Sequence, residues 1–155
     1  MQQVVNKLLM FYATGFGTGL LKPMPGTWGT LPGVPIAYLM QKLSIEYALL
    51  VYFFLVLLAF YAAEVRGRAV EDWDHPSIVC DEIVGVIPLL WYVPFGIHWF
   101  WGFILFRFLD IIKPFPISWV DSHISGPFGC LLDDLLAGAA AILFVVCLSF
   151  WVGLH

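Results

Sequence analysis

Charged side chains are scarce in this chain of 155 residues, at 12% of the total against about 25% in an average soluble domain. The seven Lys and Arg residues form no basic stripe, which argues against a nucleic-acid partner. The three cysteines include no C-x-x-C pair, which argues against a disulfide framework and against a zinc site. With 61% hydrophobic residues, the composition is that of a membrane protein, and its length allows a single domain over residues 1–155.

Long apolar runs take the place of charge. Residues 45–63 and 135–154 are the clearest membrane-spanning segments, because each is about long enough to cross a ~30 Å hydrocarbon core. Residues 4–12 are expected to form an interfacial helix, and residues 31–40 a short or partly inserted one. The small residues at 138–141 give the last span a side on which another helix can pack closely.

The segment 83–109 decides the topology. As one straight helix it would be about 40 Å long and would place Glu82 and Asp110 on opposite membrane faces. Three residues interrupt it: Pro88, Pro94 and Gly96. A turn at 93–96 would give two helices of about a dozen residues, a re-entrant hairpin that returns Asp110 to the side of Glu82. We prefer the hairpin, although the sequence alone leaves one long span open.

The connections between these segments suggest how the chain is oriented. Residues 64–74 are expected to form an exposed helical turn and loop, and residues 118–130 a loop with a turn at 126–129. Most of the positive charge falls on the side that carries the acidic residues, so the positive-inside tendency makes that side cytoplasmic. These cations are Lys7, Lys22, Arg66, Arg68 and Lys113. We predict an all-α, polytopic integral membrane protein whose short or re-entrant helices and polar loops converge on one cytoplasmic face.

Residues 15–30 form a segment rich in glycine and proline, which excludes a regular helix and permits turns whose N–H groups can hold an anion. The segment is not a Walker loop, because no Gly-Lys-Ser/Thr follows, and it is not a convincing dinucleotide fingerprint. A plain structural connector is an equally good interpretation. As a phosphate-binding segment it would use Gly17, Gly19, Lys22, Thr27 and Thr30.

Acidic residues stand at the ends of the apolar runs. Ionised side chains are costly at such positions, so they usually serve a function. Oxygen ligands suit Mg²⁺, which often takes one or two carboxylates together with water and a substrate phosphate. The four histidines show no zinc-ligand spacing. The candidate magnesium ligands are two adjacent pairs, Asp81-Glu82 and Asp133-Asp134.

Three charged residues near the end of the segment 83–109 complete the candidate site. Arg107 and Asp110 are three residues apart, as are Asp110 and Lys113, so each pair can share a helix face. Arg107 and Lys113 can neutralise a phosphate, while Asp110 orients Arg107 or reaches the metal. The alternative that these carboxylates form structural ion pairs with Lys or Arg stays open.

Other chemistries fit the sequence less well. No Cys-x₅-Arg sequence provides a cysteine nucleophile, and Asp72-Trp73-Asp74 lacks the parallel sheet that an aspartyl-nucleophile loop requires. The D-G-x₂-A-R motif of alcohol phosphotransferases is absent. A small transporter subunit with an ion or proton relay is the alternative from another class. Against it, the two clearest spans carry no carboxylate midway.

Four motifs resemble those of the phosphatidylglycerophosphatase A family of bacterial membrane enzymes. They lie at residues 15–30, 78–85, 106–116 and 133–138, in the order of the family, and they cover nearly the whole chain. The second reads Ile-Val-Cys-Asp-Glu-Ile-Val-Gly, and the last reads Asp-Asp-Leu-Leu-Ala-Gly. Pro127, within Gly126-Pro127-Phe128-Gly129, departs from the glycine pair that opens this turn in the family.

The resemblance implies an all-helical, Mg²⁺-dependent enzyme that removes the terminal phosphate of phosphatidylglycerophosphate. The product would be phosphatidylglycerol, a cardiolipin precursor, and the enzyme would lie in the bacterial cytoplasmic (inner) membrane with membrane lipids around it. The expected catalytic residues are Asp81, Glu82, Arg107, Asp110, Asp133 and Asp134. We expect Mg²⁺ to polarise the phosphoryl group and to activate water for in-line attack. A phospho-aspartyl intermediate, the number of metal ions and the oligomeric state stay open.

Overall fold

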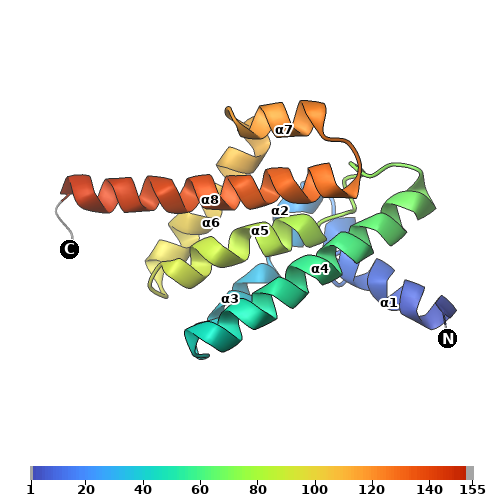
Figure 1. The fold of residues 1–155 in the computed structure, drawn as a ribbon, viewed down its shortest axis with the longest axis horizontal. Helices are drawn as coiled ribbons and strands as arrows, with labels where there is room; N and C mark the ends of the chain where they lie inside the picture. The colour runs from blue at the N-terminus through green and yellow to red at the C-terminus, as the bar shows by residue number, and fades with distance from the viewer. Residues whose placement is uncertain (1, 153–155) are drawn as a thin grey trace.

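The computed structural model describes residues 2–152, and every regular element in that range is a helix (Figure 1). The elements are α1 (Gln2–Ala13), η1 (Thr18–Leu20), α2 (Pro25–Thr30), α3 (Gly33–Met40), α4 (Ile45–Val70), α5 (Cys80–Tyr92), α6 (Ile97–Ile112), α7 (Ile117–His123) and α8 (Pro127–Val152). The all-α prediction is confirmed. The last two residues of the predicted span 135–154 lie outside the described residues.

Helix α5 is the centre of the molecule. It packs against α2, α3, α4, α6 and α8, and its middle is buried on nearly all sides. A helix that is hydrophobic all round is stable only inside a protein or a membrane. The fully buried side chains are Ile83, Val84, Val86, Ile87, Leu89 and Leu90. This packing fixes the first turn of α5, which carries Asp81 and Glu82.

The predicted interruption at Pro88 is wrong, because α5 continues through this residue. A proline has no N–H to donate to the carbonyl four residues earlier, which here belongs to Val84. The hydroxyl of Tyr52, on α4, donates a hydrogen bond of 3.0 Å to that carbonyl and so replaces the missing donor. A tertiary contact therefore compensates for a local helix breaker.

The hairpin of α5 and α6 is confirmed, with the turn at residues 93–96. Gly96 has a φ of 125°, a conformation that L side chains rarely adopt. The side-chain amide of Gln41 caps the end of α5 by donating to the carbonyls of Leu90, Trp91 and Val93 at 2.9–3.2 Å. The hairpin returns the end of α6 to the beginning of α5. The position of the hairpin within a membrane stays a prediction.

Two helices, α4 and α8, are long and apolar enough to cross a membrane by length and composition. Helix α4 runs to Val70, so most of the predicted exposed segment 64–74 belongs to it. Helix α8 begins at Pro127, eight residues before the predicted start of the last span. Proline is suited to the first helical position because its missing N–H has no partner there. Asp133 and Asp134 consequently lie in the second turn of α8 and not at its beginning.

Two further helices correct the predicted loops. Helix α7 begins at Ile117 and takes up the first part of the segment 118–130, and α2 lies within the segment 15–30, where a regular helix was not expected. Pro25 occupies the first position of α2, where it is compatible with a helix. Gly29 faces Val79 so closely that a Cβ would overlap the valine side chain. The glycines of α2 thus allow close packing rather than preventing a helix.

Helices α5 and α8 touch through glycines. A Cβ on Gly138 would overlap the carbonyl oxygen of Gly85, and a Cβ on Gly85 would lie 2.8 Å from the carbonyl oxygen of Asp134. Helix backbones can approach this closely only where small residues face each other. The predicted close-packing side of the last span is confirmed, and it brings the two acidic pairs to the same cavity.

Candidate active site

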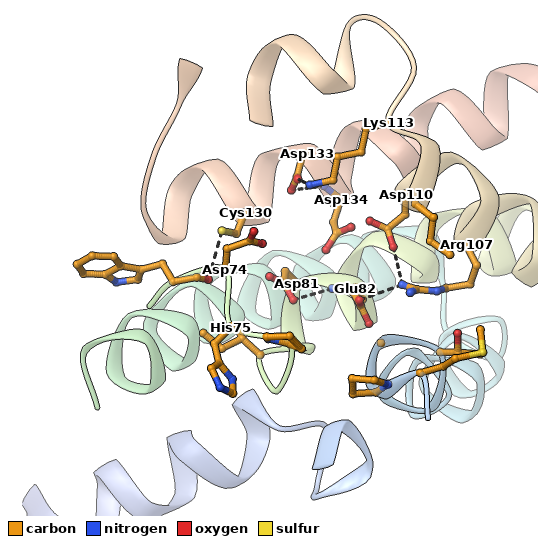
Figure 2. A pocket seen from close by; sticks show the side chains of 18 residues that line it. Asp74, His75, Asp81, Glu82, Arg107, Asp110, Lys113, Cys130, Asp133 and Asp134 are labelled. Atoms are coloured by element: carbon orange, nitrogen blue, oxygen red, sulfur yellow. Dashed lines mark hydrogen bonds and ion pairs between the residues drawn. The ribbon is translucent and has the colours of Figure 1, made fainter. Parts of the chain in front are cut away.

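A cavity of about 290 Å³ lies where the beginnings of α5 and α8 meet the end of α6 (Figure 2). The loop at residues 73–76 and the first residues of α2 close its other sides. Its charged lining residues are Asp74, Asp81, Glu82, Arg107, Asp110, Lys113, Asp133 and Asp134. Segments far apart in the sequence thus bring all six expected catalytic residues to one cavity.

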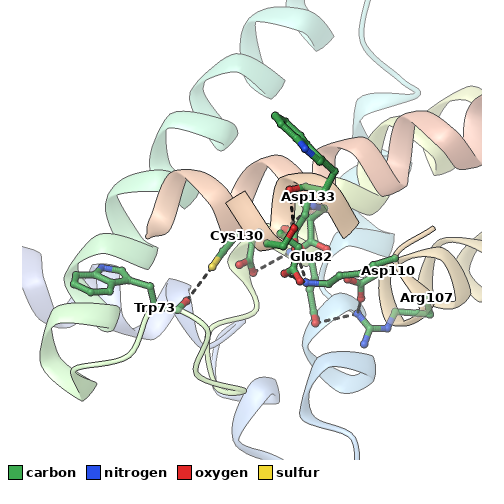
Figure 3. A network of polar contacts seen from close by, with 12 residues as sticks. Trp73, Glu82, Arg107, Asp110, Cys130 and Asp133 are labelled. Carbon is green, nitrogen blue, oxygen red and sulfur yellow. Dashed lines mark hydrogen bonds and ion pairs between the residues drawn. The ribbon is translucent and has the colours of Figure 1, made fainter. Parts of the chain in front are cut away.

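Arg107 forms the first charged cluster. One terminal nitrogen of its guanidinium lies 2.9 Å from Glu82 Oε1 and 2.5 Å from Asp110 Oδ2 (Figure 3). The same nitrogen donates to Thr30 Oγ1 at 3.4 Å. Among the described residues, its buried Nε has no hydrogen-bond partner. Arg107 is therefore held through one nitrogen, and donors of its planar fork remain to bind an oxyanion.

Thr30 and Gly26 hold this cluster together. The Thr30 hydroxyl is buried, and it lies 2.7 Å from the Gly26 carbonyl oxygen and 3.1 Å from Glu82 Oε2. A Cβ on Gly26 would overlap Glu82 and would lie 2.6 Å from Arg107. Thr30 does not itself line the cavity, whereas Thr27 does. Thr30 thus positions Glu82 and Arg107, while Thr27 is placed to touch a bound molecule.

Lys113 forms the second cluster, with Asp133 and Asp121. Its Nζ donates to Asp133 Oδ2 at 2.6 Å and also pairs with Asp121. Burial alone would lower the pKa of Lys113, but the hydrogen bonds and charges of the two aspartates raise it overall, so the lysine stays protonated. Lys113 caps α6 with a φ of 46° and so leaves the helix. Its described partners are therefore on other segments and do not include Asp110, contrary to the predicted spacing.

Asp81 and Asp134 differ from the other carboxylates. Both are buried, and neither forms an ion pair within the described part of the chain. Asp81 Oδ1 accepts a hydrogen bond of 3.0 Å from the Glu82 N–H, and Asp134 points towards Asp110 (Figure 2). Burial, followed by the charge of Glu82, raises the pKa of Asp81 well above its usual range. Buried carboxylates without a cation favour binding of a proton or a metal ion.

Glu82 also has a raised pKa. Burial shifts it from the ordinary carboxyl range to about 7, although the positive charge of Arg107 acts in the opposite direction. The negative charge of Asp110 adds to the effect of burial. The acidic cavity therefore repels further negative charge until a cation or a proton enters it.

The predicted metal ligands share one cavity but do not form a ready coordination site. Among residues 2–152, no three His, Cys, Asp or Glu side chains are grouped as metal ligands. The donor chemistry nevertheless fits Mg²⁺, because the lining carboxylates offer oxygen atoms, and this ion commonly shares them with water and phosphate. The predicted ligands concerned are Asp81, Glu82, Asp133 and Asp134.

Besides Thr30, three predicted phosphate contacts lie outside the cavity lining: Gly17, Gly19 and Lys22. A Cβ on Gly19 would meet the side chain of Val79, and one on Gly17 would meet nothing within 4 Å. These glycines serve the turn that packs residues 15–21 onto the segment before α5. The structure thus favours the structural interpretation for this half of the segment.

The loop that faces the carboxylates contributes Trp73, Asp74 and His75 to the lining, although these residues were not among the predicted site residues. The Cys130 thiol ties this loop to α8 through the Trp73 carbonyl oxygen, at 3.3 Å (Figure 3). His75 Nδ1 accepts a hydrogen bond of 3.2 Å from the Ser77 N–H, in keeping with a turn residue. The signal available in the sequence was the density of acidic residues at 71–74.

The cavity of this all-helical protein combines buried carboxylates with an arginine and a lysine. These are the features of a site for phosphate chemistry. The family described as phosphatidylglycerophosphatase A matches residues 11–149. The chain is 39% identical over 144 residues to phosphatidylglycerophosphatase A of Haemophilus influenzae, covering 90% of this chain and 88% of that protein. It is 37% identical over 139 residues to phosphatidylglycerophosphatase A of Escherichia coli K12, covering 86% and 80%. The chain therefore belongs to the phosphatidylglycerophosphatase A family and is a phosphatase.

A third relative carries a different name. The chain is 31% identical over 156 residues to a Bacteroides thetaiotaomicron protein provisionally named phosphatidylinositol-3-phosphatase, covering 94% of this chain and 96% of that protein. No solved structure matches the chain. The family resemblance inferred from the motifs is confirmed, and the transporter alternative is not favoured.

Proposed function

We propose that this protein removes the terminal phosphate of phosphatidylglycerophosphate and releases phosphatidylglycerol. The observation that carries the proposal is the meeting of carboxylates from α5, α6 and α8 around Arg107 in one cavity. The substrate follows from the names of the two relatives that are 37% and 39% identical to this chain. The charged cavity suits a phosphate headgroup, and the apolar surface of the helices suits a lipid.

The protein acts as a multi-pass protein of the bacterial cytoplasmic membrane, with the cavity at the cytoplasmic surface. In the apolar windows of α4 and α8, 22% and 33% of the residues are buried inside the protein, so most of these surfaces can face lipid. Arg66, Arg68 and Lys113 lie on segments that adjoin the acidic cavity, as the positive-inside tendency predicts for a cytoplasmic side. The acyl chains can then stay in the bilayer while the headgroup enters the cavity.

The cations bind the phosphate. Arg107 offers the second terminal nitrogen of its fork, and Asp110 fixes its orientation through the first. Lys113 supplies a second positive charge from the other side of the acidic pairs. Thr27 adds a hydroxyl donor at the edge of the cavity. These groups also stabilise the charge that develops on the phosphoryl oxygens during transfer.

Asp81, Glu82, Asp133 and Asp134 are the proposed Mg²⁺ ligands. The bound ion would supply Lewis-acid polarisation of a phosphoryl oxygen and would lower the pKa of a bound water. Asp81 and Asp134 are the more available ligands, since Glu82 and Asp133 already pair with Arg107 and Lys113.

Hydrolysis proceeds by attack of a water oxygen on phosphorus in line with the leaving glycerol oxygen. The bond between phosphorus and that oxygen breaks, the attacking water loses a proton to a cavity carboxylate, and the glycerol oxygen gains one.

The proposal is tested by measuring phosphate release from phosphatidylglycerophosphate in detergent micelles, with Mg²⁺ and with EDTA. We expect release by the wild type with Mg²⁺, and its loss both with EDTA and in Asp134→Asn. Release that persists in EDTA would overturn the metal requirement. No release by folded wild-type protein would overturn the proposed substrate, and the phosphoinositide named for the third relative would be assayed next.

A further inference from the structure

A second cavity, an apolar groove of about 540 Å³, lies between α6 and α8. Its large apolar walls are Trp101, Ile104 and Phe108 from α6, with Phe144 and Leu148 from α8. Two polar side chains also line it, His98 and Ser149, and the Ser149 hydroxyl donates to the carbonyl of its own helix at Val145. The groove contains no Asp, Glu, Lys or Arg, so its surface suits a hydrocarbon.

An exposed apolar stripe on α6 connects this groove to the acidic cavity. Ile111 lines the acidic cavity, whereas Phe108 and Ile104 line the groove. These residues are spaced three and four apart, so they share one face of the helix. Their side chains are 63%, 57% and 42% exposed, respectively. Arg107 borders this face, but its side chain is only 12% exposed and pairs with Glu82 and Asp110. The exposed surface of the stripe is therefore apolar and gives a ligand a path between the two cavities.

The distances along α6 and α8 from the acidic cavity to the groove match the depth of one lipid leaflet. From Ile111 to Trp101, α6 rises about 15 Å over ten residues. From Asp134 to Phe144, α8 rises the same distance of about 15 Å. Half of a ~30 Å hydrocarbon core is also about 15 Å. The α6 wall therefore runs from the headgroup cavity over about the depth that a single acyl chain occupies, and the α8 wall, which begins at Phe144, faces the far part of that path.

We propose that the groove between α6 and α8 holds one acyl chain of the lipid whose phosphate occupies the acidic cavity. The inference rests on the proposed lipid phosphatase function. The chain follows the stripe from Ile111 over Phe108 and Ile104 and ends between Trp101 and Leu148. The groove thereby selects lipid phosphates with long acyl chains over water-soluble phosphate esters.

The first test fills the groove without touching the catalytic cavity. Leu148→Trp adds bulk inside the groove, and Leu143→Trp makes the same change on the same helix at an exposed position outside it. With dioleoyl substrate, we expect kcat/KM of Leu148→Trp to fall about tenfold and that of Leu143→Trp to stay near wild type. With the dihexanoyl form, whose chains are too short to reach Leu148, we expect no loss in either variant. Equal effects on both substrates would overturn the proposal.

The second test locates the acyl chain directly and needs no variant. A phosphatidylglycerophosphate analogue with a diazirine near the end of one acyl chain is photolysed with the wild-type protein, and labelled peptides are identified by mass spectrometry. We expect labelling at residues 98–108 and 144–149, suppressed by excess unlabelled substrate. Labelling spread evenly over α4, or confined to contacts between two copies of the chain, would overturn the assignment.

The two proposals fail in distinguishable ways. Wild-type protein that releases no phosphate from the dioleoyl or the dihexanoyl lipid would overturn the proposed function. Wild-type protein that hydrolyses both lipids, with no effect of Leu148→Trp on either, would retain the function and overturn the acyl-chain groove.

Discussion

The adjacent acidic pairs of α5 and α8 meet at one cavity, and each has one member that contacts a cation. Glu82 of the α5 pair lies 2.9 Å from Arg107, and Asp133 of the α8 pair lies 2.6 Å from Lys113. The cations come from the same short region: Arg107 lies one turn before the end of α6, and Lys113 is the residue that caps this helix. Glu82 and Asp133 therefore each keep a positively charged side chain beside the cavity.

The other members, Asp81 and Asp134, are buried and have no cation partner within residues 2–152. A paired carboxylate has its charge compensated by the fold, whereas an unpaired one requires a proton or a bound cation. The comparison therefore divides the carboxylates of the site into two groups. One group is paired with Arg107 or Lys113, and the other requires a proton or a bound cation. The variants below are designed to break or sharpen this division.

Asparagine at either unpaired position should have the largest effect. We expect Asp81→Asn and Asp134→Asn to reduce kcat on the order of 100- to 1000-fold, because each loses a negative oxygen that we propose as a ligand of Mg²⁺. Asp121→Asn is the matched control: it pairs with Lys113 from an exposed position outside the acidic cavity, and it should retain activity within a few fold. Steady-state phosphate release measures all three. If Asp121→Asn lowered kcat as much as the other two variants do, the division into paired and unpaired carboxylates would be contradicted.

The two cations should differ when they are exchanged. Arg107→Lys keeps the charge but removes the guanidinium fork. This fork contacts Glu82 and Asp110 and still has donors free for phosphate, so we expect its loss to lower kcat/KM about 100-fold. Lys113→Arg keeps a charge that its aspartate partners already stabilise, and it should cost less than about tenfold. Steady-state kcat/KM values of the two variants, measured at saturating Mg²⁺, provide the comparison. Comparable losses would show that charge alone matters at both positions.

The glycine contact that brings the acidic pairs together should be sensitive to a single methyl group. In Gly138→Ala, the Cβ would overlap the Gly85 carbonyl oxygen, so we expect α5 and α8 to separate with a destabilisation of about 1–3 kcal/mol. Gly102→Ala is the control, because its Cβ would meet Leu90 at 3.5 Å, an ordinary contact. Thermal unfolding in detergent provides the comparison. A Gly138→Ala melting temperature equal to that of Gly102→Ala would disprove the tight contact.

The smallest expected effect is on pH dependence. Burial raises the pKa of Glu82 to about 7, so the side chain is protonated at lower pH and cannot bind a metal. Raising the pH from about 6 to about 8 should therefore strengthen Mg²⁺ binding severalfold and release a proton on binding. Calorimetry in buffers of different ionisation enthalpy measures both quantities. Glu82→Gln should flatten the profile, and a flat profile in the wild type would contradict the prediction.

Much of this architecture follows from local signals in the sequence. The apolar runs predicted helices, and Pro94 and Gly96 placed the hairpin turn correctly. The interruption predicted at Pro88 is wrong, because a helix breaker is a local signal, and the Tyr52 hydroxyl that compensates for it comes from another helix. The beginning of α8 was also misplaced, since proline at a first helical position and proline in a turn look alike in a sequence.

The sequence by itself determined the apolar helices and the acidic pairs of the candidate site, because hydrophobic periodicity and charge are properties of short stretches. Tertiary structure alone decided which carboxylate meets which cation, and it placed Gly17, Gly19 and Lys22 outside the cavity lining. These outcomes depend on how closely α5 and α8 approach at Gly85 and Gly138 and on where α6 ends. Distances across helices are set by side-chain volumes at many positions together, so no single stretch of sequence contains them.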